Sequence, residues 1–143
     1  MLINGNWMTE GDGITRPFVE IRLVASDGSV HSAQFLIDTG ADRTVFTATL
    51  LDLLQPPLTP ATEEAFAGVG GFTEYLVFDS VLEFATSSGT LLRVRGQFAG
   101  FVDPRAMDVN ILGRDVLNNF AVIVSWHEKR VLLLTPPTRY QIV

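Results

Sequence analysis

Cysteine is absent from this sequence, and histidine occurs only twice, as His31 and His127. A chain without cysteine has no disulfide framework, which suits a reducing compartment, so we expect a cytoplasmic protein. Zinc sites combine cysteine, histidine and carboxylates at characteristic spacings, and neither histidine has a partner at such a spacing. We therefore expect no metal site.

Positive charge is also scarce. Ten lysine and arginine residues stand against sixteen aspartate and glutamate residues, for a net charge of -6. Nucleic-acid binding depends on clustered basic residues that release counterions, so we expect no nucleic-acid partner. No apolar run approaches the ~20 residues of a membrane helix, and the N-terminal segment lacks the basic and apolar regions of a secretory signal. We expect a soluble protein with no membrane partner.

The chain has 143 residues, of which 47% are hydrophobic and 18% charged. This composition is typical of a globular protein. The length allows one substantial core but is short for two, so we predict a single domain over residues 1–143. Such a chain holds one functional site, or half of one.

Alternating apolar and polar residues predict many short strands. Residues 16–24 alternate in this way, and an Asp-Gly turn within 26–29 returns the chain into a second strand that ends at Asp38. Further strands are predicted in two hairpins, one over 75–84 and 90–102, the other over 121–126 and 130–135.

Two short helices interrupt the strands. Thr47 is a possible N-cap for leucines at helical spacing, and the helix ends before Pro56. The second helix follows Gly113 and turns three apolar residues inward: Val116, Leu117 and Phe120. Many short strands with one or two short helices predict a mainly β fold, a closed or nearly closed β-barrel.

Asp38 follows the apolar residues Phe35–Ile37 directly, where a buried carboxylate is normally costly. The position makes sense if the carboxylate faces a second one. Gly40 permits a tight turn and donates its backbone N–H, and the Thr39 hydroxyl can anchor the loop. Two carboxylates about 3 Å apart retain one proton between them, so one acts as base and the other as acid on a shared water.

Four segments together resemble the retropepsins, the single-domain aspartic proteases of retroviruses and their cellular and bacterial relatives. "LIDTGADRTV" is similar to the catalytic loop, "AGVGGF" to the glycine-rich flap, "NILGRDVL" to the segment before the family's helix, and "RPFVEIRL" to the opening strand. The resemblance spans about residues 16–120. It implies a closed acid-protease β-barrel with a flap hairpin.

The resemblance also implies roles for individual residues. Asp38 matches the catalytic aspartate, Thr39 the threonine whose hydroxyl bonds the partner loop, and Gly40 completes the motif. The backbone N–H of Val69, at the flap tip, matches the one that reaches the substrate. The substrate cleft and flap are assigned to Ala41, Asp42, Val45, Gly68, Val69, Gly70, Val109 and Ile111.

A chain with one Asp-Thr-Gly is half an enzyme in this family, and no second motif of this kind occurs here. The resemblance therefore implies a two-fold homodimer with the active site on the symmetry axis and a peptide or protein as substrate. It also implies that Arg114 pairs with Asp42 of its own subunit and that Arg16 pairs with Asp42 across the dimer.

The sequence departs from the viral pattern at two places. Arg43 stands where many viral members have a second acidic residue. The chain also continues past residue 120 with a hairpin and a Pro-Pro tail, whereas viral dimers interleave short terminal strands. Trp7 and the segment 140–143 are therefore candidates for a rebuilt interface, or for covering their own core.

The glycine-rich segment has a simpler interpretation as well, because Gly-Gly is common in hairpin turns. "GVGGFT" lacks the last glycine of a dinucleotide fingerprint and the Gly-Lys of a P-loop, so we expect no cofactor.

Three functions remain to be compared. The first is a homodimeric aspartic endopeptidase that uses the paired Asp38 carboxylates. The second is a non-catalytic dimerisation or peptide-binding module that has kept the barrel. The third, a glycosidase with two flanking acids, requires a second acid in a comparable context, and the sequence has none.

Overall fold

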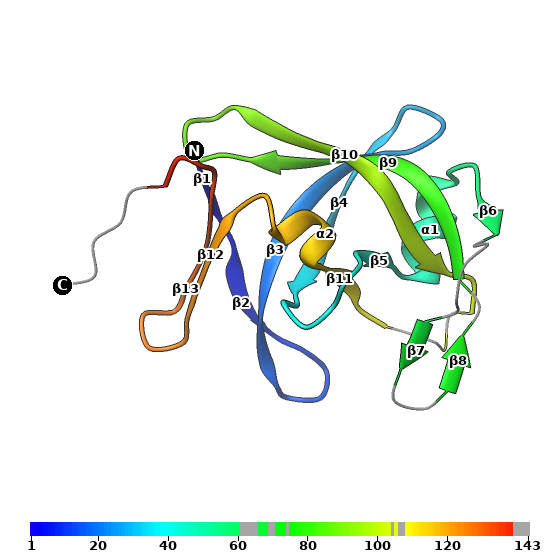
Figure 1. Cartoon of the computed structure of the whole chain (residues 1–143), viewed down its shortest axis with the longest axis horizontal. Coiled ribbons are helices and arrows are strands. Elements are labelled where there is room, and N and C mark those ends of the chain that lie inside the picture. Colours follow the sequence, from blue (N-terminus) through cyan, green and yellow to red (C-terminus); the bar gives the residue numbers. More distant parts are fainter. Residues whose placement is uncertain (61–65, 69–70, 74, 104, 106–107, 139–143) are drawn as a thin grey trace.

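Six strands form a closed ring in the computed structural model, which describes residues 1–60, 66–68, 71–73, 75–103, 105 and 108–138 (Figure 1). Hydrogen bonding follows the order β3-β4-β11-β5-β10-β9, and a pairing of β9 with β3 closes the ring. This confirms the predicted mainly β, closed barrel. Its strands are β3 (Thr15–Val24), β4 (Val30–Ile37), β5 (Val45–Phe46), β9 (Tyr75–Ala85), β10 (Leu91–Phe101) and β11 (Asn110–Leu112).

The β3–β4 hairpin follows the predicted alternation. Val19, Ile21 and Leu23 of β3 are buried, whereas the polar residues between them are exposed. The turn contains Gly28 at φ 86°, and the Asp27 carboxylate accepts a hydrogen bond from the Ser29 N–H. A positive φ favours glycine, so the Asp-Gly sequence fixes where the chain reverses.

Both helices begin where the sequence predicts. Helix α1 (Ala48–Leu54) has Thr47 as its N-cap, whose hydroxyl accepts a hydrogen bond from the Leu50 N–H. Its buried residues enter the main core beneath β9 and β10. Helix α2 (Arg114–Leu117) has Gly113 as its N-cap. Neither helix is long and apolar enough to span a membrane.

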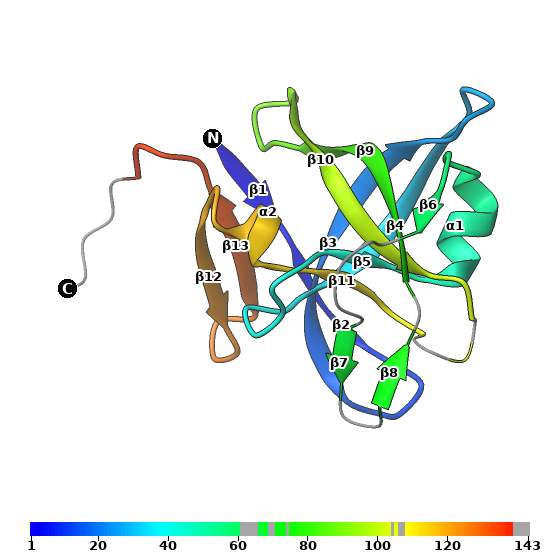
Figure 2. The same ribbon diagram turned by 45° about the vertical axis from the view of Figure 1, so that its right-hand side comes forward.

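The N-terminal segment forms two strands that the sequence pattern did not predict. Strand β2 (Asn6–Thr9) pairs with β3 of the barrel. Strand β1 (Leu2–Asn4) pairs with β13 (Arg130–Leu134), and β13 also pairs with β12 (Ala121–Ser125), so these three strands form a second sheet. Figure 2 shows this three-stranded sheet beside the barrel. The two strands were missed because three or four residues are too short to display a period.

Gly5 allows the chain to pass from one sheet to the other. Its N–H donates to the Val131 carbonyl at 2.7 Å, and a Cβ at this position would lie 2.4 Å from the Phe18 carbonyl oxygen. The indole N–H of Trp7 donates to the Ser125 carbonyl, and Trp7 packs against the main core. Trp7 therefore helps to cover the core of its own chain.

Three further short strands lie near the end of the barrel that holds helix α1. Strand β6 (Thr59–Pro60) pairs with β9. Strands β7 (Phe66–Gly68) and β8 (Gly71–Thr73) pair antiparallel as a separate two-stranded sheet, visible in Figure 2. The predicted hairpin at the glycine-rich segment is thus present.

Candidate active site

The Asp38–Gly40 turn begins directly after β4, where the strand leaves the sheet. The Asp38 N–H still donates to the Leu112 carbonyl of β11 at 3.1 Å, and the Ala41 N–H donates back to the Asp38 carbonyl at 3.2 Å. The first bond ties the turn to the barrel and the second closes it. Asp38 is therefore placed by a rigid sheet rather than by a free loop.

One oxygen of the Asp38 carboxylate is fixed by its own loop. The Gly40 N–H donates to Asp38 Oδ1 at 2.9 Å, and a Cβ at Gly40 would lie 3.2 Å from the same oxygen. A side chain at position 40 would therefore press on the carboxylate oxygen, which would have to shift slightly to make room. Asp38 is half-buried, while Thr39 is exposed and its hydroxyl has no partner among the residues described.

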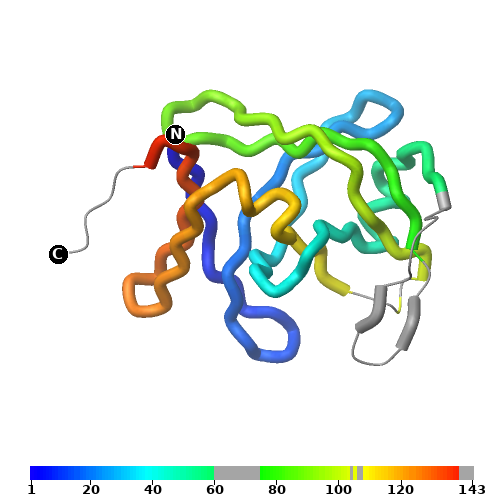
Figure 3. Tube along the Cα trace, in the orientation of Figure 1, coloured from blue at the N-terminus to red at the C-terminus, as the bar shows by residue number. Residues whose placement is uncertain are grey.

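Helix α2 holds the far side of the loop. The Arg114 N–H donates to the Ala41 carbonyl at 2.8 Å, and the Asp115 N–H donates to the Asp42 carbonyl at 3.2 Å. The Arg114 guanidinium also pairs with the Asp42 carboxylate, as the resemblance implies. Figure 3 shows the cyan loop and the orange-yellow helix running side by side.

A hydrogen-bond network around the buried Thr44 was missed at the sequence level. Thr44 is fully buried, and its N–H donates to both oxygens of the Asp115 carboxylate at 3.0 Å. Its hydroxyl donates to Asp115 Oδ1 at 2.7 Å and accepts from the Gly113 N–H at 3.0 Å. The signal for it is a threonine just before the apolar pair Val45–Phe46, where a buried hydroxyl needs partners.

Two of the predicted cleft residues meet across neighbouring strands. Val45 of β5 pairs with Ile111 of β11, and both belong to a small apolar cluster separate from the main core. Val45 is buried, Ile111 and Ala41 are half-buried, and Asp42 is exposed. Val109 lies half-buried in the bend before β11.

The flap positions are described in part. Gly68 ends β7 and pairs with Gly71, the first residue of β8. Val69 and Gly70, the predicted tip, lie outside the described residues.

Arg16 has partners within its own chain. Its guanidinium donates two hydrogen bonds to the Asp12 carboxylate, at 3.2 and 2.8 Å, and lies 3.4 Å from Glu10. The hydrogen bond from Arg16 lowers the pKa of Asp12 and raises that of Arg16, and Asp12 also accepts the Ile14 N–H. The pairing with Asp42 of a second copy remains a prediction.

This arrangement offers one positioned carboxylate rather than two. A single carboxylate can act as a base or as an acid at one moment, and cleavage of an amide by water needs both. Within the described ranges, no group of three or more histidine, cysteine or acidic residues is placed to hold a metal ion.

Comparisons with known proteins agree with this geometry. The family model described as retroviral aspartyl protease matches residues 14–124, and no curated protein sequence matches the chain.

Two solved structures share the fold. EIAV protease in complex with the inhibitor HBY-793 is 22% identical, with a TM-score of 0.52 over 78% of this chain and 92% of that one. A retropepsin-like aspartic protease from Rickettsia conorii is 14% identical, with a TM-score of 0.58 over 93% of this chain and 88% of that one. Since the family model covers most of the residues, including the Asp38 loop, the chain belongs to the retroviral aspartyl protease family.

Proposed function

We propose that this protein is a homodimeric aspartic endopeptidase, with one Asp38 from each subunit at the catalytic centre. The observation that carries the proposal is the Asp-Thr-Gly turn, in which the Gly40 N–H holds Asp38 Oδ1 and the barrel fixes the backbone. The motif occurs once in a chain of this family. The second carboxylate must therefore come from a second copy.

The paired carboxylates share one proton, because two close negative charges repel. The ionised Asp38 takes a proton from a water molecule, whose oxygen bonds to the peptide carbonyl carbon. The protonated Asp38 gives its proton to the carbonyl oxygen. When the C–N bond breaks, the nitrogen takes up the proton of the pair and leaves as an amine. One hydroxyl of the tetrahedral intermediate gives its proton back to the pair as the new carboxyl group forms, which restores the shared proton.

The exposed outer edge of β12 is an observation in favour of a dimer. Val124 lies on the same face of the sheet as the buried Val131, yet the Val124 side chain is 44% exposed. Ile123, on the other face, is 37% exposed. In the described part of the chain, β12 has a neighbouring strand on one side only. Antiparallel pairing of β12 with its own copy would cover these residues and is compatible with a two-fold axis.

Two further roles follow from the dimer. Thr39 is exposed and without a partner within the described chain, so we assign its hydroxyl to the loop of the second subunit. Arg16 would reach Asp42 of that subunit. The cleft and flap are formed by Ala41, Asp42, Val45, Gly68, Val69, Gly70, Val109 and Ile111.

The test is a peptide-library digest at acidic and neutral pH. Wild type should cleave, Asp38→Asn should lose all cleavage, and Asp52→Asn, which alters an exposed aspartate of helix α1, should cleave as wild type does. Cleavage that survives in Asp38→Asn contradicts the mechanism. Sedimentation of the same samples should give the mass of a dimer for all three.

If wild type forms the dimer and cleaves nothing, the non-catalytic dimerisation or peptide-binding module becomes the better account. If Asp38→Asn also loses the dimer, the loss of cleavage no longer identifies Asp38 as catalytic. Mass and activity therefore have to be measured together.

A further inference from the structure

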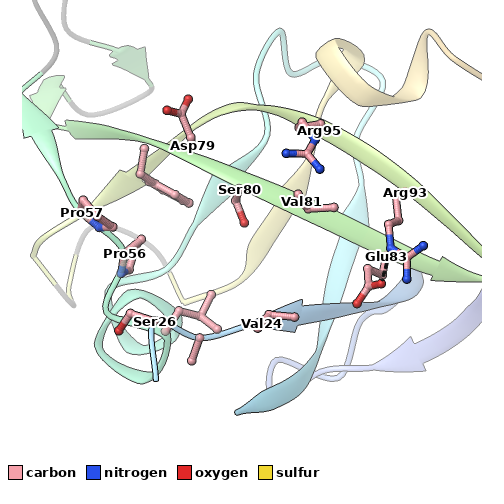
Figure 4. A pocket seen from close by; sticks show the side chains of 13 residues that line it. Val24, Ser26, Pro56, Pro57, Asp79, Ser80, Val81, Glu83, Arg93 and Arg95 are labelled. Carbon is pink, nitrogen blue, oxygen red and sulfur yellow. Dashed lines mark hydrogen bonds and ion pairs between the residues drawn. The ribbon is translucent and has the colours of Figure 1, made fainter. Parts of the chain in front are cut away.

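A cavity lies at the end of the barrel beside helix α1, and none of its lining residues belongs to the candidate active site. Its volume is about 350 Å³, within the ~300–1,000 Å³ range of small-molecule sites. The end of β3, the end of α1, β9 and β10 all contribute to its walls (Figure 4).

The walls of this cavity are held in place. The Ser26 N–H donates to the Leu54 carbonyl at 2.9 Å, which joins the β3–β4 turn to the last turn of helix α1. Gln55 then ends the helix in the left-handed conformation, and Pro56 and Pro57 continue the wall. A cavity bounded by bonded turns and prolines is largely formed before a ligand arrives.

Most of the lining is apolar. Val24, Leu54, Phe78 and Val81 contribute side chains, and Val24 is 53% exposed although valine is normally buried in a strand. Exposed apolar area in a concave site stabilises a bound apolar group, because binding removes both surfaces from water. The cavity therefore favours a ligand with an apolar body.

The charges at one end come from alternate positions of β10. Arg93 lies opposite Glu83 and donates to it at 2.8 Å, and Glu83, only 6% exposed, is also paired with Arg22. Arg95 lies opposite Val81 instead. As a result, the Arg95 guanidinium has no hydrogen bond or ion pair with any residue in the described part of the chain.

Asp79 lies on the same face of the β9–β10 pair as Arg95, because its partner in β10 is Gln97, two residues further along that strand. The Asp79 carboxylate repels a second negative charge, whereas Arg95 attracts the first. The ligand that suits this lining carries one anionic group and an uncharged apolar remainder.

We propose that this cavity binds a small monocarboxylate with an apolar tail, with its carboxylate on Arg95 and its tail against Val24, Leu54 and Phe78. A guanidinium binds a carboxylate through two parallel hydrogen bonds, and that of Arg95 has no partner among the residues that the structure describes. The proposal does not depend on proteolysis, because no residue of the catalytic loop takes part.

Hexanoate is a suitable probe, with 1-hexanol as its uncharged counterpart. In ¹H–¹⁵N correlation spectra of the whole protein, hexanoate should shift the amide signals of Ala25, Ser26 and Val81 and the Arg95 Nε–H signal. Hexanol should bind at least about fivefold more weakly, because it lacks the charge-assisted bond. Equal binding of the two compounds, or shifts spread over the whole surface, overturns the proposal.

Arg95→Gln removes the charge from an exposed side chain that loses no partner within the described ranges, so the fold should be kept. It should weaken hexanoate binding at least about fivefold and leave hexanol binding unchanged. The matched control is Arg105→Gln, at an exposed arginine outside the cavity lining, which should bind hexanoate as wild type does. Unchanged hexanoate binding by Arg95→Gln rules out the assigned contact.

The tail is tested separately by Val24→Ser, which should weaken hexanoate and hexanol alike. A peptide C-terminus carries the same chemistry, so acetyl-Leu-Val with a free carboxylate serves as the competing ligand. Both acetyl-Leu-Val and unlabelled hexanoate are titrated against bound, labelled hexanoate. If acetyl-Leu-Val displaces the label at one tenth of the concentration that unlabelled hexanoate requires, the cavity recognises peptide ends and the small-molecule assignment is wrong. Displacement at similar or higher concentration supports it.

Discussion

The Asp38 loop and the outer edge of β12 differ in how far their groups find partners within the described chain. Beneath the loop, both polar groups of Thr44 that can donate are bonded to Asp115, and its hydroxyl also accepts the Gly113 N–H. At the edge, the described chain offers β12 no strand beyond β13, and Val124 remains 44% exposed.

This difference separates a region that is satisfied within one chain from an edge that the proposed second copy would cover. The hydrogen bonds around the buried Thr44 fix the loop, because leaving a buried group unsatisfied is costly. An open strand edge has no such constraint and can pair with another strand. We expect substitutions at the loop to affect folding, and substitutions at the edge to affect association.

The largest effect should come from Gly113→Ala, which disrupts the packing of helix α2 against the Asp38 loop. A Cβ there would lie 2.4 Å from the Arg43 carbonyl carbon and 2.5 Å from its oxygen, and backbone atoms cannot move aside cheaply. We expect a loss of at least about 3 kcal/mol in the free energy of unfolding, measured with urea. Gly11→Ala, where nothing lies within 4 Å of the added Cβ, is the control and should be close to neutral.

Thr44→Val should be the next most damaging. It keeps the shape of the side chain but removes the hydroxyl, so the Gly113 N–H loses its buried acceptor and Asp115 loses one donor. Leaving a buried group unsatisfied costs about 1–3 kcal/mol, and urea unfolding measures it. Thr44→Ser, which retains the hydroxyl, should recover most of the stability. Equal losses in both variants would show that packing, not the network, matters here.

At the open edge, Val124→Lys should leave unfolding nearly unchanged and weaken the dimer at least about tenfold, since a charge on an edge strand opposes pairing. Sedimentation equilibrium gives the dissociation constant, and cleavage per subunit should fall in parallel. Leu53→Lys, at an exposed leucine of helix α1, is the matched control. A dimer unaffected by Val124→Lys places the interface elsewhere.

The smallest effect concerns Asp12, whose partner Arg16 is satisfied within its own chain. The hydrogen bond from Arg16 lowers the pKa of Asp12 below its ordinary 3.8. The resulting stabilisation is present above pH 3.8 and is lost as the pH falls through the lower, folded pKa. In Arg16→Gln, the Asp12 titration followed by carboxyl ¹³C NMR should move up toward 3.8. A midpoint that does not move means that the Ile14 N–H sets the pKa.

The elements with a clear local signal were predictable. The β3–β4 hairpin has alternating residues and an Asp-Gly turn, and helix α1 has a threonine cap, so the structure confirms both. Strands β1 and β2 were missed because their stability comes from pairing with β13 and β3, which no local pattern records.

In the candidate site, too, some features were predictable from the sequence and others were not. The ion pair between Arg114 and Asp42 was anticipated from the family resemblance, and it is present. The bonds of Thr44 to Asp115 and Gly113 join residues about seventy positions apart. The local signal is limited to a threonine placed before the apolar pair Val45–Phe46, and it does not identify Asp115 and Gly113 as its partners.

The sequence by itself determined the turn chemistry from Asp38 to Gly40, because it acts over neighbouring residues. The closure of the barrel, the hydrogen bonds of Thr44 beneath the Asp38 loop and the lack of a partner for Arg95 within the described residues were decided only by tertiary structure. Strand register sets which side chains face one another, and register results from pairing between distant segments.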